Sequence, residues 1–171
     1  MALGLVIGAT GVAANSVAEH DELDGLISQV LEAQSAIAYS DHRVAATVDY
    51  TLPLLFSWRT PARVRAGLQQ LVQDEAAGQV ADIALERDHA RRQPVLPWHL
   101  ALRRAKTTLV IYLEARVAYL HSVATNQHTL YVEHPELDRM LVTARDAFRR
   151  AAGPGQQSRV DAAFAGGTHP A

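Results

Sequence analysis

Apolar residues recur at three- and four-residue steps through one long stretch of this chain, and this periodicity constrains the fold more than any other feature. The stripe lies between Glu19 and Thr51 and continues just beyond it. Its members are Leu23, Leu26, Ile27, Val30, Ile37, Val44, Val48 and Leu52. Side chains at this spacing share one face of an α-helix. The sequence therefore predicts a long amphipathic helix that must bury this face against neighbouring helices.

Prolines mark where this helix ends and where three further helices begin, because proline breaks a helix interior but suits its first turn. Pro53 is expected to end or kink the first helix, and the apolar residues 54–58 are expected to form a buried corner. The second helix is expected over residues 61–92 and the third over residues 97–125. A shorter fourth helix is expected to start at Pro135.

Each of these later helices also has an apolar face. The inward positions are Leu68, Val72, Ala76, Val80 and Ile83 in the second, Leu102, Leu109, Leu113, Val117 and Leu120 in the third, and Leu137, Leu141, Ala144 and Phe148 in the fourth. Short connectors make consecutive helices antiparallel neighbours. The predicted fold is therefore all-α: an antiparallel helical bundle, with coiled-coil-like packing, of three long helices plus a shorter fourth over residues 19–152. Residues 153–171 lack periodicity and are rich in glycine and small residues, so a disordered tail is expected.

The first eighteen residues form an apolar N-terminal segment with no charged side chain. As a helix they would span about 27 Å, close to the ~30 Å hydrocarbon core of a bilayer. Gly4 and Gly8 have the spacing at which membrane helices approach each other. No Lys or Arg precedes the apolar run, which counts against both a membrane anchor and an export signal. Residues 1–18 are interpreted as a membrane anchor (a transmembrane helix or signal-anchor) or a cleaved signal, with a buried or unstructured apolar segment as the alternative.

The composition excludes several classes of function. With 16 basic and 18 acidic side chains the net charge is −2, so no overall basic field favours nucleic acid. The chain has no cysteine, which excludes disulfide scaffolds, cysteine zinc sites and thiol nucleophiles. Residues 6–11 look like the start of a dinucleotide-binding turn, but the strand–helix–strand context that such a turn requires is not predicted. No cofactor, metal or catalytic residue is assigned, and the sequence favours a protein that is not an enzyme.

Glu86 and His89 form an E-x-x-H pair, the spacing that di-metal carboxylate bundles use to place two ligands on one helix face. Such sites need a second pair and two further glutamates at the same height. In the antiparallel register expected for the second and third helices, the other candidates scatter along the bundle, so a di-metal site is not predicted. The same register predicts ion pairs from Glu86 to Arg103 and from Asp82 to Lys106.

Asp41 interrupts the apolar stripe of the first helix, where a carboxylate is costly without a partner. His121 of the third helix lies at a similar height in the expected register. A buried Asp41–His121 pair is therefore predicted as a structural contact. The alternative is that Asp41, His42 and His121 form the site of a soluble helical enzyme or of a ligand- or metal-binding bundle.

The turn between the second and third helices is the most informative surface. It gathers Arg91, Arg92, Trp98, Arg103 and Arg104. Cations at a helix C-terminus oppose the helix dipole, but Arg103 and Arg104 near the start of the third helix gain nothing from it. Arginine binds lipid phosphates and tryptophan prefers the membrane interface. The turn is thus predicted to be the surface for a protein or anionic-lipid partner.

The function expected from these features is that of a non-enzymatic helical bundle that acts through protein or lipid contacts. Residues 1–18 would tether it to a membrane or direct its export. Its expected location is the membrane or cell envelope, with the cytoplasm as the alternative. Packing between helices also offers a route to a homo-oligomer.

Overall fold

The computed structural model describes residues 4–125 and 134–166, with side chains from Asn15 onward. Five helices lie within these ranges, and no strand occurs within them. They are α1 (Gly4–Leu55), α2 (Ala62–Arg92), α3 (Leu100–Thr125), α4 (Pro135–Ala151) and α5 (Gln157–Ala165). The prediction of an all-α helical bundle is confirmed.

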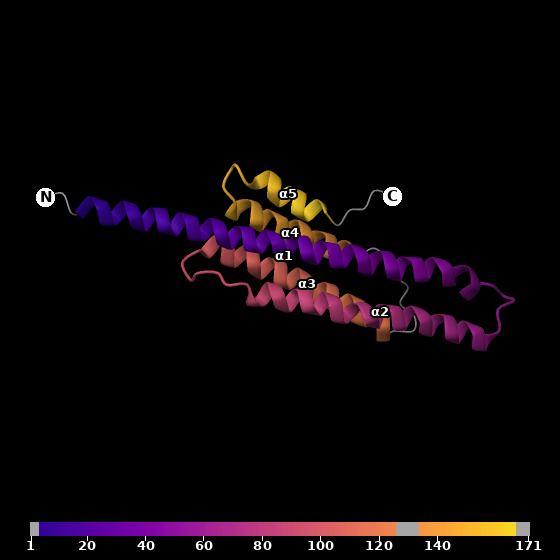
Figure 1. Ribbon diagram of the computed structural model, residues 1–171. Helices are drawn as coiled ribbons and strands as arrows, with labels where there is room; N and C mark the ends of the chain where they lie inside the picture. Colours follow the sequence, from indigo (N-terminus) through magenta and orange to yellow (C-terminus); the bar gives the residue numbers. More distant parts are fainter. Residues whose placement is uncertain (1–3, 126–133, 167–171) are drawn as a thin grey trace.

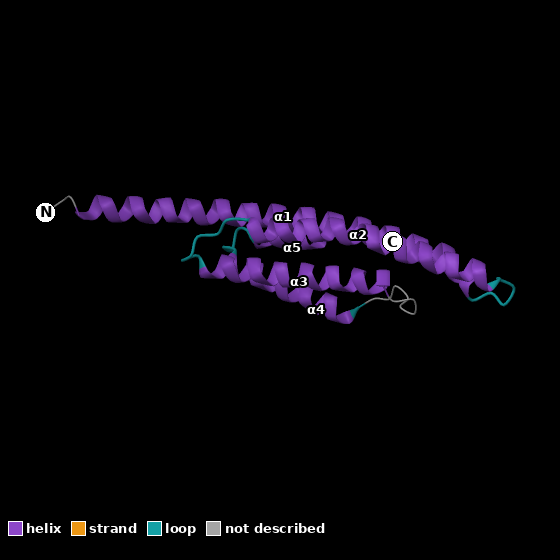
Figure 2. Ribbon diagram, turned by 90° about the horizontal axis from the view of Figure 1, so that it is seen from below, coloured by secondary structure: helices purple, strands orange, loops and turns teal. Residues whose placement is uncertain are grey.

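The helix α1 runs the length of the molecule, and the other helices are arranged around it (Figure 1). The helix α2 returns along α1, α3 packs on α2, and α4 packs on α3. The short α5 closes the arrangement because it contacts both α4 and α1. Figure 2 shows that the α1–α2 hairpin extends past the ends of α3 and α4, as it also does in Figure 1.

The predicted apolar stripe of the first helix is buried in the core. Seven of its members are buried: Leu23, Leu26, Ile27, Val30, Ile37, Val44 and Val48. At 52 residues, α1 is about 78 Å long. It includes residues 4–18, most of the apolar N-terminal segment defined from the sequence. Among the described residues, no helix combines the length and the apolar character needed to cross a bilayer.

The prediction of a buried corner at residues 54–58 is wrong. Pro53 does end the helix, since α1 stops two residues later at Leu55. Phe56 and Trp58, however, are 74% and 83% exposed. They lie at the part of the α1–α2 hairpin that extends past α3 and α4, so no other described helix covers them (Figure 2).

The later helices largely follow the predicted faces. In α3 the buried residues include Leu102, Leu109, Leu113 and Leu120, and in α4 they include Leu137, Ala144 and Phe148. The helix α2 buries less of its predicted arc, because only Ala76 and Ile83 are fully enclosed.

The expectation of disorder from residue 153 is wrong over Gln157–Ala165, which form α5. Its buried residues Val160, Ala163 and Phe164 have the i, i+3, i+4 spacing of one helix face. The Phe164 ring packs edge-on against Phe148 of α4, with 5.3 Å between the ring centroids. A nine-residue helix is marginal by itself, so these contacts stabilise it. Residues 167–171 lie outside the described residues.

The register predicted between α2 and α3 is also wrong. Glu86 lies beside His89 of its own helix, with 3.8 Å between Oε2 and Nδ1, and the Lys106 ammonium donates a hydrogen bond to the Gln93 carbonyl at 2.7 Å. Further along, Arg91 pairs with Glu114. The physical reason is the connector: residues 93–99 carry the chain beyond the end of α2 before α3 begins at Leu100, not at Pro97 (Figure 1).

Candidate functional site

The structure brings the five predicted surface residues together at the α2–α3 turn. Arg91, Arg92, Trp98, Arg103 and Arg104 are all exposed there. Arg91 forms ion pairs with Glu114 and, at 3.6 Å, with Asp88. Arg103 donates a hydrogen bond to the Pro97 carbonyl at 3.2 Å. Part of the positive charge of this turn is therefore neutralised by acidic neighbours.

This turn is also fastened to α1 by contacts that the sequence did not reveal. The Glu22 carboxylate accepts a hydrogen bond from the Leu96 backbone N–H at 3.0 Å, and its other oxygen lies 2.7 Å from the His99 ring Nδ1. The Trp98 indole donates to the Asn15 side-chain oxygen at 2.9 Å. His99 is only 5% exposed. These bonds give the turn a structural role in joining α1 to the start of α3.

Asp41 pairs with an α3 side chain, as predicted, but the partner is Arg116 and not His121. Arg116 is buried, whereas the Asp41 side chain is 37% exposed, so the prediction of a mostly buried carboxylate is wrong. His42 and His121 are both exposed. Among the described residues, the group able to hold a metal ion includes none of Asp41, His42 and His121.

The end of the α1–α2 hairpin carries the most exposed aromatic side chains of the described structure. We define the hairpin tip as residues 50–65. Its exposed large apolar residues are Tyr50, Leu54, Phe56, Trp58 and Val64. The Arg59 guanidinium lies over the Trp58 ring, 4.9 Å from the ring centroid. Arg65 donates two hydrogen bonds, of 3.1 and 3.0 Å, to the Thr60 carbonyl.

The charge of the tip has a single sign. Between Asp49 and Asp74 the sequence has three arginines, Arg59, Arg63 and Arg65, and no acidic residue. All three arginines are exposed. The distribution of charges between the first and second helices is a sequence signal for this feature, which the expectation of a buried corner at residues 54–58 did not use.

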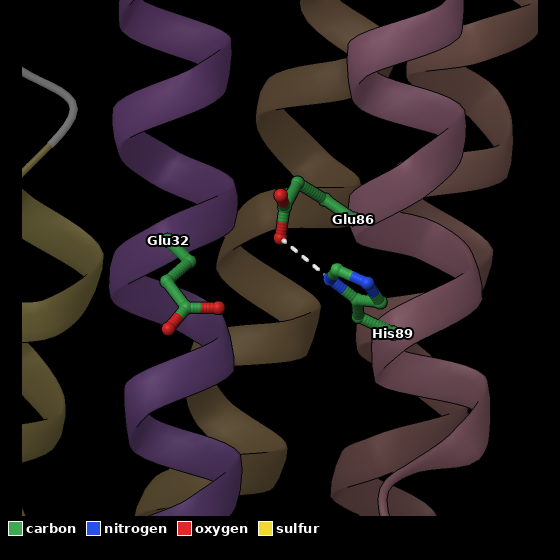
Figure 3. A group of neighbouring side chains, drawn as sticks. All are labelled: Glu32, Glu86 and His89. Atoms are coloured by element: carbon green, nitrogen blue, oxygen red, sulfur yellow. Dashed lines mark ion pairs between the residues drawn. The ribbon is translucent and has the colours of Figure 1, made fainter.

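A third cluster joins the E-x-x-H pair to α1. Figure 3 shows Glu86 and His89 of α2 facing Glu32 of α1. One ligand atom from each residue lies within 4.8 Å of the other two, and His89 Nδ1 is 3.8 Å from Glu86 Oε2. Burial raises the pKa of Glu86, with the neighbouring Glu32 charge adding to the rise and His89 opposing it. Sequence reasoning missed Glu32 because the inter-helix register decides which residue of α1 faces the pair.

The tip and the Glu32–Glu86–His89 cluster are therefore two candidate sites among the described residues. The first presents apolar and cationic groups to the surroundings, and the second converges carboxylate and imidazole groups on one point. Comparison of the chain with protein-family models, with curated proteins and with solved structures found no match.

Proposed function

We propose that this protein is a non-enzymatic helical bundle that binds peripherally to an anionic membrane surface through its hairpin tip. The observation that carries the proposal is the exposure of Phe56 and Trp58 at the projecting end of the α1–α2 hairpin. They belong to a stretch with three arginines and no acid. Peripheral binding of this kind needs no membrane-spanning helix.

The chemistry of the tip matches the two layers of a membrane interface. Aromatic side chains, tryptophan above all, partition to the level of the lipid headgroups. Arginines bound near an anionic leaflet contribute about 1 kcal/mol each. Arg59, Arg63 and Arg65 together then contribute about 3 kcal/mol, which corresponds to about a hundredfold preference for anionic over neutral lipid.

A lipid surface suits this tip better than a folded protein partner does. The tip projects from the bundle (Figure 2), and a fluid bilayer accepts a projecting shape without a complementary pocket. The Arg59 side chain stacked on Trp58 keeps a cation beside the apolar ring, so both groups reach the same depth.

The α2–α3 turn is the competing surface, since it too combines arginines with an exposed Trp98. Asp88 and Glu114 neutralise Arg91 there, whereas no acidic residue lies in the tip or between the tip and Asp74. The Trp98 indole is also hydrogen bonded to Asn15, which would restrict its insertion into lipid. The tip is therefore the better contact.

Vesicle flotation of the full chain tests the proposal. Phosphatidylcholine vesicles with and without phosphatidylglycerol are compared at low and high salt. Binding is expected for the anionic vesicles and should weaken as salt rises. Two variants, F56S/W58S and R59Q/R63Q, should each lose binding, and Arg65 is left in place because it bonds to Thr60.

The matched control is R103Q/R104Q at the α2–α3 turn, which removes the same amount of charge from the other surface. It should bind like the unaltered chain. The proposal fails if the full chain ignores anionic vesicles at low salt, or if both tip variants bind normally. Loss of binding in the control alone would place the contact at the turn instead.

A further inference from the structure

The Glu32–Glu86–His89 cluster has the composition and spacing of a site for a single metal ion. Glu86 and His89 are three residues apart on α2, so they share one face, and Glu32 approaches from α1 (Figure 3). Their ligand atoms all lie within 4.8 Å of one another. One ion placed among them would contact all three residues after small side-chain rotations.

The Glu86 carboxylate has an oxygen that the protein leaves without a hydrogen-bond donor. Its Oε2 atom is shielded from solvent and unbonded, and the His89 Nδ1 atom is beyond hydrogen-bond range at 3.8 Å. A buried carboxylate oxygen without a donor is costly. Glu32 and Glu86 also place two negative charges side by side. A bound cation would satisfy the oxygen and separate the two charges.

An outer contact orients the α1 ligand. The Gln29 side-chain amide donates a hydrogen bond to Glu32 Oε2 at 2.9 Å. Hydrogen bonds of this kind commonly fix the orientation of metal-binding carboxylates. Because Gln29 lies one turn before Glu32 on the same helix, it holds the carboxylate independently of α2.

From this geometry we propose that Glu32, Glu86 and His89 bind one divalent transition-metal ion, with Zn²⁺ as the best match. Zn²⁺ binds both imidazole nitrogens and carboxylate oxygens, whereas Mg²⁺ and Ca²⁺ prefer oxygen ligands alone. Three protein ligands leave one tetrahedral position open. A surface groove lined by Ser35, Tyr39 and Asp82 adjoins Glu32 and Glu86, and gives solvent access to that position.

The proposed site differs from the di-metal arrangement considered for the E-x-x-H pair. That arrangement needs two such pairs and two more glutamates in one plane. Here one E-x-x-H pair is completed by a single glutamate from the neighbouring helix, which suits one ion and not two.

Isothermal titration of the metal-free full chain with Zn²⁺ tests the site. One ion per chain is expected to bind, and Mg²⁺ is expected not to compete. The variants H89A, E86Q and E32Q should each weaken binding by at least about tenfold, since even outer-contact changes cost about 10–100-fold. The variant Q29A should weaken it less. Because Glu32 is exposed, E32Q keeps the test valid even if a change at the more buried Glu86 disturbs folding.

The matched control is H42A, which removes an exposed histidine of α1 away from the cluster. It should bind Zn²⁺ like the unaltered chain. The His89 ring resonances, identified by their loss in H89A, should shift until one equivalent of Zn²⁺ has been added. The proposal is overturned if the full chain shows no saturable Zn²⁺ binding, or if H89A and E32Q bind as tightly as the unaltered chain.

Discussion

Replacing Glu22 by alanine should destabilise the bundle more than any other single change to an acidic residue of α1. The Glu22 carboxylate holds the α2–α3 connector through the Leu96 N–H and the His99 ring. Alanine leaves both groups without their acceptor. The His99 side chain is almost completely enclosed, so water cannot easily replace the lost oxygen.

The expected cost follows from the two bonds. A hydrogen bond to a charged group contributes about 1.5–3 kcal/mol. Leu96 is only half-buried, so water can partly replace its bond, and the combined loss is about 2–4 kcal/mol. For a chain of this size that loss lowers Tm by about 4–16 °C. E22Q keeps an acceptor oxygen but not the charge, and it should lose about half as much.

Urea unfolding followed by circular dichroism at the helix band measures the loss. Asp21 provides the matched control because it is the neighbouring acidic residue and is exposed. D21A should change the free energy of unfolding by less than about 0.5 kcal/mol. If E22A unfolds at the same urea concentration as D21A, the Glu22 bonds do not stabilise the fold and the reasoning is refuted.

Four further outcomes are expected from the same structure. D41A removes the ion pair that joins the buried Arg116 to α1 and should cost about 1–3 kcal/mol, and the double variant D41A/R116M should recover part of that loss. Equal unfolding midpoints for D41A and the unaltered chain would contradict the contact. The hydrogen bond from Arg43 lowers the pKa of Glu75 below its ordinary value of 4.5. The stability that R43Q loses at neutral pH should therefore shrink as the pH falls below that value. A difference in unfolding free energy that does not depend on pH would exclude this link. Gly67 and Gly78 lie at exposed positions of α2, where an added methyl group meets no heavy atom within 4 Å. G67A and G78A should each stabilise the protein by about 0.5–1 kcal/mol, measured as a rise in Tm. F164A removes the aromatic contact that docks α5, so trypsin should cleave after Arg159 faster than in the unaltered chain. An unchanged cleavage rate would indicate that polar contacts hold α5 in place.

The helices were predictable because local signals specify them. The spacing of apolar residues places the stripe of α1, and α2 ends at Arg92 and α4 begins at Pro135 as the sequence indicates. These signals depend on neighbours within a turn or two, so they predict the helices without knowledge of the rest of the fold. The same logic failed for α5, whose nine residues are too few to show a convincing period.

The contacts between helices were not predictable, because they depend on how each connector turns. Seven residues separate α2 from α3, and their path displaced the register by several turns, so Glu86 does not meet Arg103. For the same reason the sequence paired Asp41 with His121 when Arg116 is the neighbour. Exposure of the hairpin tip likewise depends on where α3 and α4 end, which no pattern within residues 50–65 records.

The contact between α1 and α5 has a consequence for how the chain is made. Arg159 of α5 donates to Asp24 of α1 at 2.9 Å, across a separation of 135 residues. At a translation rate of about 5–20 residues per second, Asp24 is synthesised about 7–27 seconds before Arg159. During that interval the face of α1 that receives α5 stays uncovered on the nascent chain. Chaperones that recognise apolar helix surfaces would find their target there until the last helix docks.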